Sequence, residues 1–145
     1  MLRTLTAAVL SLSLLAPALA QDAKPTAAAA PQLALELNAL KAADTGCLVT
    51  FLATNNLGGQ LERAAVEVAL FNGEGAIDRI VTLDFKNLSP GKTKVLQFAL
   101  EGLSCDGVGR VLVNDISACE GTGIAPESCL AGLVTTTRPD ITFGV

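Results

Sequence analysis

Hydrophobic residues recur at every second position over most of the chain that follows position 32. This period is typical of half-buried β-strands, because successive side chains of a strand point to opposite faces of its sheet. Asn- and Gly-rich segments at 55–59, 72–75 and 87–91 have the composition of tight turns. The pattern predicts about seven short strands, in the segments 33–37, 47–53, 66–70, 77–85, 96–100, 111–113 and 130–143.

Two of these segments are less regular than the others. The Leu and Ala content of the segment 33–43 also suits a helix, so this segment has two interpretations. In the segment 130–143, Pro139 predicts an edge strand or a break, because proline has no N–H to donate within a sheet.

Short strands with turns between them indicate an all-β fold, and we expect a small antiparallel β-sandwich of immunoglobulin-like type. The chain has no Trp or Tyr, so the usual central Trp and corner Tyr of that fold are missing. Five Phe residues, together with Leu and Val, must fill the core instead. The predicted β-sandwich domain spans residues 32–145.

The first 31 residues have a different pattern, that of an export signal and a linker. In the segment 1–20, Arg3 precedes an apolar run, and Ala18-Leu19-Ala20 forms a small-x-small cleavage site of a signal peptide. The apolar run is too short to span a bilayer, which needs roughly 20 residues. The Ala- and Pro-rich segment 21–31 predicts a flexible linker. We therefore expect a periplasmic or secreted protein with no membrane span.

The charge of the chain limits its partners. Cleavage after Ala20 changes the net charge from −4 to −5, because it removes Arg3 and no acidic residue. Nucleic acid phosphates attract clustered Lys and Arg, which an acidic chain of this kind does not offer. The composition therefore predicts neither a nucleic-acid binder nor a polybasic membrane-surface binder.

All four cysteines, Cys47, Cys105, Cys119 and Cys129, lie in the predicted domain. An even number of Cys in an exported chain indicates disulfides. A zinc site needs close ligand pairs, whereas the separations here are 58, 14 and 10 residues and the chain has no His. Three connectivities are open. If consecutive strands run up and down, Cys47 meets Cys105 at one end and Cys119 faces Cys129 at the other, which predicts these two pairs.

The absence of His removes the commonest general base and the commonest metal ligand. Ser-His-Asp and Cys-His arrangements are therefore excluded, and oxidised cysteines cannot act as thiolate nucleophiles. A Ser-Lys pair is left open, although Lys92 and Lys94 look like solvated strand positions. We expect no enzymatic activity, no cofactor and no bound metal.

Four polar residues, Asp106, Arg110, Asn114 and Asp115, form the candidate ligand-binding set. Asn114 and Asp115, beside Arg110, would suit a cation or a polar ligand. The competing interpretation, which we favour, is that Asn114 and Asp115 close the end of a strand and Arg110 is solvated or ion-paired. A calcium loop gathers several oxygen ligands within about a dozen residues, and this segment has no such cluster.

Two predicted strands are apolar on both faces. Leu48 and Leu52 lie opposite Val49 and Phe51, and the strand around Val66 shows the same feature. We favour the interpretation that these are central strands, or that the N-terminal segment and the C-terminal tail cover them. The alternative is an exposed apolar patch, which would mark a partner-binding surface.

One part of the chain resembles a known group of proteins. The segment 83–98, Leu-Asp-Phe-Lys-Asn-Leu-Ser-Pro-Gly-Lys-Thr-Lys-Val-Leu-Gln-Phe, and the segment 105–115, Cys-Asp-Gly-Val-Gly-Arg-Val-Leu-Val-Asn-Asp, are similar to uncharacterised exported proteins of alphaproteobacteria with an immunoglobulin-like β-sandwich. The similarity covers most of the predicted domain, including its cysteines. It implies a periplasmic location and brings no activity, cofactor or site residue.

These observations predict a non-enzymatic periplasmic domain that binds or supports another component of the cell envelope, such as a protein. The first alternative is a small-ligand or ion carrier that uses a loop end around Asp106, Arg110 and Asp115. The second alternative is a hydrolase of Ser-Lys type.

Overall fold

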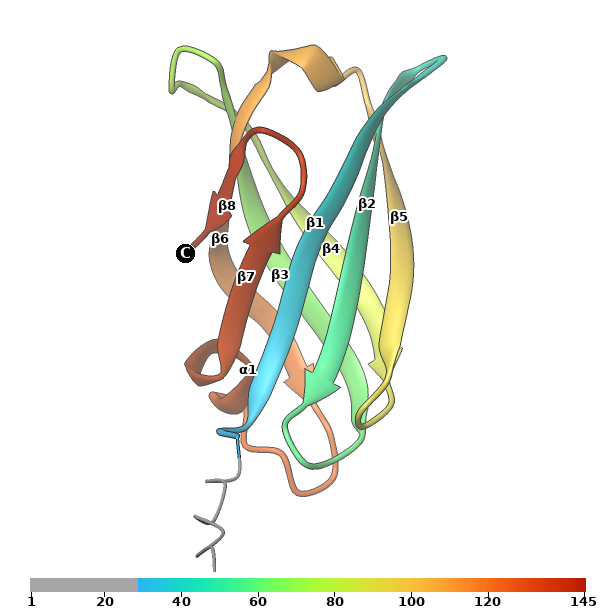
Figure 1. Ribbon diagram of the computed structural model, residues 1–145, viewed down its shortest axis with the longest axis vertical. Helices are drawn as coiled ribbons and strands as arrows, with labels where there is room; N and C mark the ends of the chain where they lie inside the picture. Colours follow the sequence, from blue (N-terminus) through green and yellow to red (C-terminus); the bar gives the residue numbers. More distant parts are fainter. Residues whose placement is uncertain (1–28) are drawn as a thin grey trace, which may run out of the picture.

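The computed structural model describes residues 29–145, so the predicted signal peptide and most of the predicted linker lie outside the described residues. The described residues form two four-stranded sheets that pack face to face (Figure 1). A 3-10 helix, η1 (Cys105–Gly107), and a short helix, α1 (Ser128–Ala131), lie in the connections. The strands are β1 (Gln32–Ala43), β2 (Gly46–Asn56), β3 (Leu61–Asn72), β4 (Ile77–Leu88), β5 (Thr93–Glu101), β6 (Val108–Glu120), β7 (Leu133–Thr137) and β8 (Thr142–Gly144).

The order of strands is β5-β2-β1-β7 in one sheet, here called sheet A, and β4-β3-β6-β8 in the other, sheet B. The prediction of an all-β sandwich is therefore confirmed, with eight strands instead of about seven. The segment 33–43 belongs to strand β1. The last predicted segment divides at Pro139 into β7 and β8, which join the edges of different sheets.

Consecutive strands run up and down through the sandwich, as the sequence analysis assumed (Figure 1). Most neighbouring strands are accordingly antiparallel, but β1–β7 and β6–β8 are parallel pairs. Both exceptions follow from the alternation, because β1 and β7 are both odd-numbered strands and β6 and β8 are both even-numbered. The predicted sandwich is thus antiparallel except at these two edges.

The core lies between the two sheets and is centred on aromatic side chains. The Phe51 ring meets Phe85, Phe98 and Phe143 edge to face, with ring centroids 5.8, 6.1 and 5.5 Å away. Edge-to-face contact is a favourable geometry for aromatic pairs. Inward-facing Leu and Val residues of both sheets surround this group. Four of the five Phe residues therefore fill the space that Trp occupies in many sandwiches, and Phe71 lies outside it.

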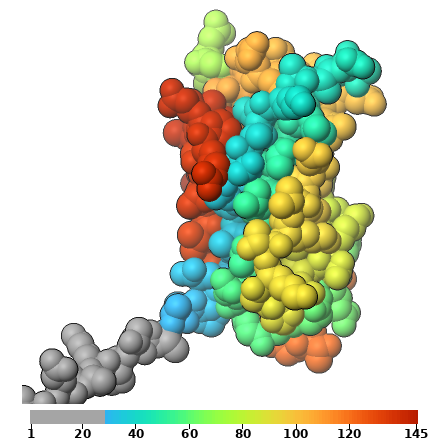
Figure 2. Space-filling model, turned by 45° about the vertical axis from the view of Figure 1, so that its right-hand side comes forward, coloured from blue at the N-terminus to red at the C-terminus, as the bar shows by residue number. Residues whose placement is uncertain are grey.

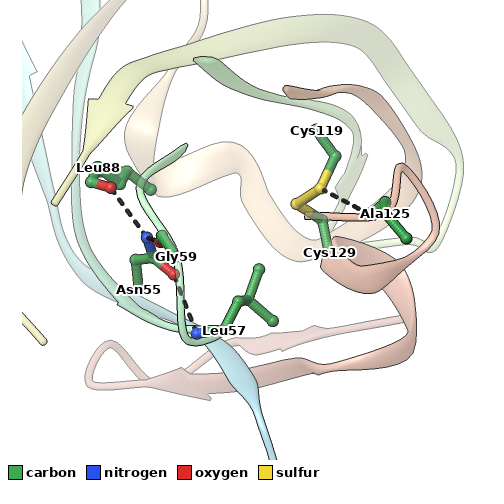
Figure 3. Close-up of a disulfide and its surroundings, with 7 residues drawn as sticks. All are labelled: Asn55, Leu57, Gly59, Leu88, Cys119, Ala125 and Cys129. Carbon is green, nitrogen blue, oxygen red and sulfur yellow. Dashed lines mark hydrogen bonds between the residues drawn. A yellow bond between two sulfur atoms is a disulfide. The ribbon is translucent and has the colours of Figure 1, made fainter. Parts of the chain in front are cut away.

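Both predicted disulfides are present, with the predicted pairing. The bridge Cys47–Cys105 joins the start of β2 in sheet A to η1, which leads into β6 of sheet B. The bridge Cys119–Cys129 joins the end of β6 to α1 at the opposite end of the sandwich (Figure 3). Each bridge therefore fastens one end of the two-layer structure.

A fully buried amide orders the loops beside the second disulfide. The Asn55 side chain donates hydrogen bonds to the carbonyl oxygens of Leu88, at 2.9 Å, and Gly59, at 2.8 Å. Its Oδ1 accepts a hydrogen bond from the backbone N–H of Leu57 (Figure 3). Asn55 thereby ties the loop after β2 to the end of β4.

Two cationic side chains close the sandwich along β4 and β5. Lys94 of β5 donates from Nζ to the carbonyl oxygens of Phe85 and Asn87 on β4, at 3.2 and 3.1 Å. Arg79 of β4 donates from Nη1 to the carbonyl oxygen of Glu101 on β5, at 2.7 Å. The prediction that Lys94 is a solvated position is therefore wrong. Its aliphatic stem reaches across the rim while the ammonium group binds edge carbonyls.

No helix among residues 29–145 is long and apolar enough to cross a membrane.

Candidate binding face

The structure places the four predicted ligand residues along one strand and the turn before it. Asp106 lies in η1, and Arg110, Asn114 and Asp115 lie in β6, all four exposed. A strand advances about 3.3 Å per residue, so roughly 15 Å of β6 separates Arg110 from Asp115. The structure therefore does not bring the four residues together.

Three of these residues have contacts of their own. The Arg110 guanidinium lies over the ring of Phe71, 5.4 Å from its centroid, which is a cation–π contact. The Asn114 amide donates to the Glu67 carboxylate, and Asp115 lies opposite Glu67 across the β3–β6 ladder. The role of Glu67 is not visible in the sequence, because residues 67 and 115 meet only through strand pairing.

The predicted position of Asn114 and Asp115 at a strand end is wrong. Strand β6 continues to Glu120, and its register against β3 shifts between Val113 and Asp115. This shift is a β-bulge, which leaves one residue unpaired and turns polar side chains outward within a strand. Among residues 29–145, no group of three or more His, Cys, Asp or Glu side chains is arranged to hold a metal ion.

The chain contains one Ser-x-x-Lys sequence, Ser89 to Lys92. It lies in the turn between β4 and β5, where the Lys92 N–H donates to the Ser89 carbonyl oxygen at 3.3 Å. Lys92 is exposed in this turn. A Ser nucleophile needs its base within hydrogen-bond reach, and no bond between these two side chains exists in the described structure.

The outer surface of sheet A has a different character from the ligand set. We call this surface the A face and define it by the outward-facing residues of the four strands. Strand pairing arranges them in rows across the sheet, such as Thr93, Thr54, Ala34 and Val134 in one row. The A face includes Ala34, Glu36, Ala39, Lys41, Leu48, Thr50, Leu52, Thr54, Thr93, Val95, Gln97, Ala99, Glu101, Val134 and Thr136.

Apolar side chains stand open on the A face. Val95 is 63% exposed and Val134 is 39% exposed, and Leu48 and Leu52 are half-buried. Strand β2 is a central strand, as expected, but the C-terminal tail does not cover it, because the tail forms β7 and β8 at the sheet edges. In Figure 2 the strands of sheet A lie at the surface, from the red β7 segment to the yellow β5.

A shallow hollow of about 200 Å³ lies on the A face. Its floor is at Ala34, whose small side chain stands between larger neighbours on β2 and β7. The hydroxyl groups of Thr54 and Thr93 form a hydrogen bond of 2.7 Å at its rim. Leu52 and Val134 supply apolar walls. The hollow therefore suits an apolar side chain of a partner, with hydroxyl groups available beside it.

The charged residues of the A face are few and offset one another. Lys41 and Glu101 lie at one end of the face, opposite Leu48 and Gly46 in the ladder. Glu36 accepts hydrogen bonds from the Asn38 amide at 2.8 Å and the Arg138 guanidinium at 2.6 Å. The Asn38 hydrogen bond, followed by the Arg138 contact, holds the pKa of Glu36 below its usual range. Glu36 is thus an ionised carboxylate whose charge is balanced by Arg138.

The outer surface of sheet B is more polar. It also exposes apolar residues, with Ile77 and Ile80 57% and 51% exposed. However, charged side chains of β3, β4 and β6, among them Glu67, Asp84 and Arg110, are interspersed with them. The A face carries fewer charged side chains than the outer surface of sheet B, and it has the hollow at Ala34. We therefore take it as the candidate binding face.

Comparisons of the chain with protein-family models, with curated proteins and with solved structures found no match.

Proposed function

We propose that the chain is a non-enzymatic binding domain, periplasmic or secreted, and that it contacts a protein of the cell envelope through the A face. The observation that carries this proposal is a neutral, hollowed and partly apolar sheet surface that the described chain leaves open. Exposed apolar patches rimmed by polar residues mark interaction surfaces in many proteins, because their burial against a partner is favourable.

The proposed compartment is supported by the two disulfides. Such bonds persist in oxidising environments outside the reducing cell interior. The predicted signal peptide and the resemblance to exported alphaproteobacterial proteins support the same location. The immunoglobulin-like description stays a prediction. The β2–β5 and β3–β6 pairs suit it, whereas the parallel β6–β8 pair does not follow its antiparallel plan.

The surface chemistry of the A face supports a protein partner. Threonine hydroxyls and small apolar side chains on a flat sheet match the mixed polar and apolar surface of another folded protein. The face carries no cluster of Lys or Arg, which a phosphate-rich partner would require. We therefore expect binding by contact area and a few hydroxyl hydrogen bonds.

The alternative function is a small-ligand or ion carrier that uses Asp106, Arg110, Asn114 and Asp115. The opposed carboxylates of Glu67 and Asp115 are the observation that favours it. A rise in melting temperature with calcium that Asp115→Asn abolishes would support this alternative. An unchanged melting temperature at millimolar calcium would exclude a calcium site of ordinary extracellular affinity.

Paired lysine variants test the proposed binding face. The double variant Leu52→Lys/Val95→Lys places two charges on the A face, and we expect it to lose the protein that the wild-type chain recovers from envelope extract of the source cells. The control Ile77→Lys/Ile80→Lys changes two exposed apolar residues of sheet B and should recover that protein normally. Circular dichroism should show that both variants fold. Equal recovery by both variants would contradict the proposal.

A further inference from the structure

The edges of the two sheets are protected to different degrees. A strand at a sheet edge presents unpaired N–H and C=O groups that can pair with another chain. Along β4 and β5 the edges lie against each other, and Lys94 and Arg79 donate to carbonyl oxygens across the rim. These side chains occupy edge groups that an added strand would need.

The opposite edge of sheet B is also protected. Strand β8 is only three residues long and pairs with β6 over Arg110–Leu112. Beyond this pairing, β6 carries the bulge at Asn114 and the charge of Asp115. Short length, a bulge and charge are the usual devices that keep an edge from pairing.

Strand β7, at the edge of sheet A, is five residues long and lies near β8, but it has neither a bulge nor a charge. Among the described residues, no side chain donates to its backbone as Lys94 and Arg79 do on the other side. Its sequence, Leu-Val-Thr-Thr-Thr, contains no charge and no proline, and its residues favour extended structure. Its register against β1 is continuous from Leu133 to Thr137. No other strand of residues 29–145 pairs with its outer side.

The unpaired groups of β7 can be assigned from the ladder. Gly132 accepts from the N–H of Leu33, and the N–H of Arg138 donates to Leu37. In a parallel ladder the residues that bond to one neighbour alternate. Residues 132, 134, 136 and 138 therefore face β1, and Leu133, Thr135 and Thr137 present N–H and C=O groups outward.

We propose that β7 pairs with β7 of a second copy of this chain, antiparallel about a two-fold axis at Thr135. The three outward-facing residues are symmetric about position 135, so Thr135 meets its own copy and Leu133 meets Thr137. Each pair exchanges two hydrogen bonds in an antiparallel ladder, which gives six bonds. The outcome is one continuous eight-stranded sheet with two A faces side by side.

Charge and contact area determine how strong this dimer would be. Two acidic molecules repel each other, and β7 offers a stretch without charge where they can approach. The nearest cation, Arg138, is already paired with Glu36. A five-residue strand pair is smaller than the interface of a permanent dimer. The dimer should therefore be weak and depend on concentration, with the A faces free to bind.

Sedimentation equilibrium of the oxidised mature chain tests this dimer. Thr135→Pro removes an outward N–H without changing the bonds to β1, and we expect it to weaken dimerisation about tenfold or more. The matched control is Ala99→Pro on the β5 edge of the same sheet. Along this edge, the residues that bond to β2 alternate with residues whose N–H points outward. Gly102 donates to Thr45 on the β2 side, so the N–H of Ala99, an odd number of residues away, points outward. This variant should dimerise as the wild type does.

A charge-swap pair keeps the test decisive if a proline variant fails to fold. Position 134 lies opposite position 136 of the second copy in the proposed register. Copies with Val134→Lys/Thr136→Lys and copies with Val134→Glu/Thr136→Glu should each stay monomeric, and their mixture should form a heterodimer. The proposal is overturned by a wild-type protein that is monomeric up to about 1 mM. It is equally overturned by charge-swapped copies that do not associate when mixed.

Discussion

At the scale of single residues, polar side chains hold the ends of the sandwich. Asn55 is the clearest case, because its buried amide satisfies three backbone groups from three different positions. The sequence predicted a turn at 55–59 but not this role. An Asn in a Gly-rich segment looks like an ordinary turn residue, and its contact with Leu88 is visible only once β2 and β4 are folded.

Asn55→Ala should lower the free energy of unfolding by about 2–4 kcal/mol. The substitution leaves the Leu88 and Gly59 carbonyl oxygens and the Leu57 N–H without partners, and each unsatisfied buried group costs about 1–3 kcal/mol. Urea unfolding followed by circular dichroism measures the change. The neighbouring exposed Asn56 is the control, and Asn56→Ala should stay within about 0.5 kcal/mol of the wild type. Equal effects at both positions would contradict the assigned role.

Asp84 links the fold to pH. Lys86 donates to its carboxylate from Nζ, at 3.0 Å, and from its backbone N–H, at 2.9 Å. These bonds hold the pKa of Asp84 below its usual range, the side-chain bond first. They also support Lys86 in a left-handed conformation, with φ of 62°. Because the folded-state pKa is lower than the unfolded one, Asp84 stabilises the fold above about pH 4.

We expect the stability difference between the wild type and Asp84→Asn to be present at pH 7 and to vanish as the pH falls from about 5 to about 2. The reason is that the wild-type carboxylate becomes protonated and loses its preference for the folded state. Thermal unfolding at a series of pH values measures this difference. Thr82→Ala, on the same strand, should show a constant offset across the series. A difference for Asp84→Asn that stays constant down to pH 2 would contradict this account.

At the scale of elements, the recurrence of hydrophobic residues at every second position predicted the strands from local sequence. The hydrophobic residues at 33, 35 and 37 and at 47, 49 and 51 face the core as their spacing requires. The sequence did not predict the parallel pairs or the contact of Lys94 with β4. Both depend on which strands become neighbours, and this choice involves residues far apart in the chain. For the same reason the sequence favoured a central or covered strand at 47–53 over the open apolar A face that the structure shows.

The two disulfides should differ in their contribution to stability. A cross-link stabilises by limiting the unfolded chain, and the effect grows with the length of the closed loop. The chain-entropy argument gives about 4 kcal/mol for Cys47–Cys105, with a separation of 58 residues, and about 3 kcal/mol for Cys119–Cys129, with a separation of 10.

We therefore expect Cys47→Ala/Cys105→Ala to unfold at lower urea concentration than Cys119→Ala/Cys129→Ala. Equilibrium urea unfolding of both double variants and of the wild type measures the order. The reverse order would show that packing around the buried Cys129 outweighs loop length in this fold.

At the scale of the whole molecule, export and oxidation combine in one expectation. Intact-mass measurement of the protein from the periplasm should give the mass of residues 21–145 less four hydrogens, because cleavage follows Ala20 and two disulfides form. Reduction should restore the four hydrogens. A mass that retains residues 1–20 would contradict the predicted export signal.

The whole fold presents its most open neutral surface on sheet A, and the central claim is that this surface meets a protein partner. Photo-crosslinking in living cells tests the claim most directly, with a photoreactive amino acid in place of Val95 on the A face or of Ile80 on sheet B. We predict a discrete adduct with one envelope protein at position 95 and none at position 80. Adducts at position 80 alone, or at neither position, would contradict the claim.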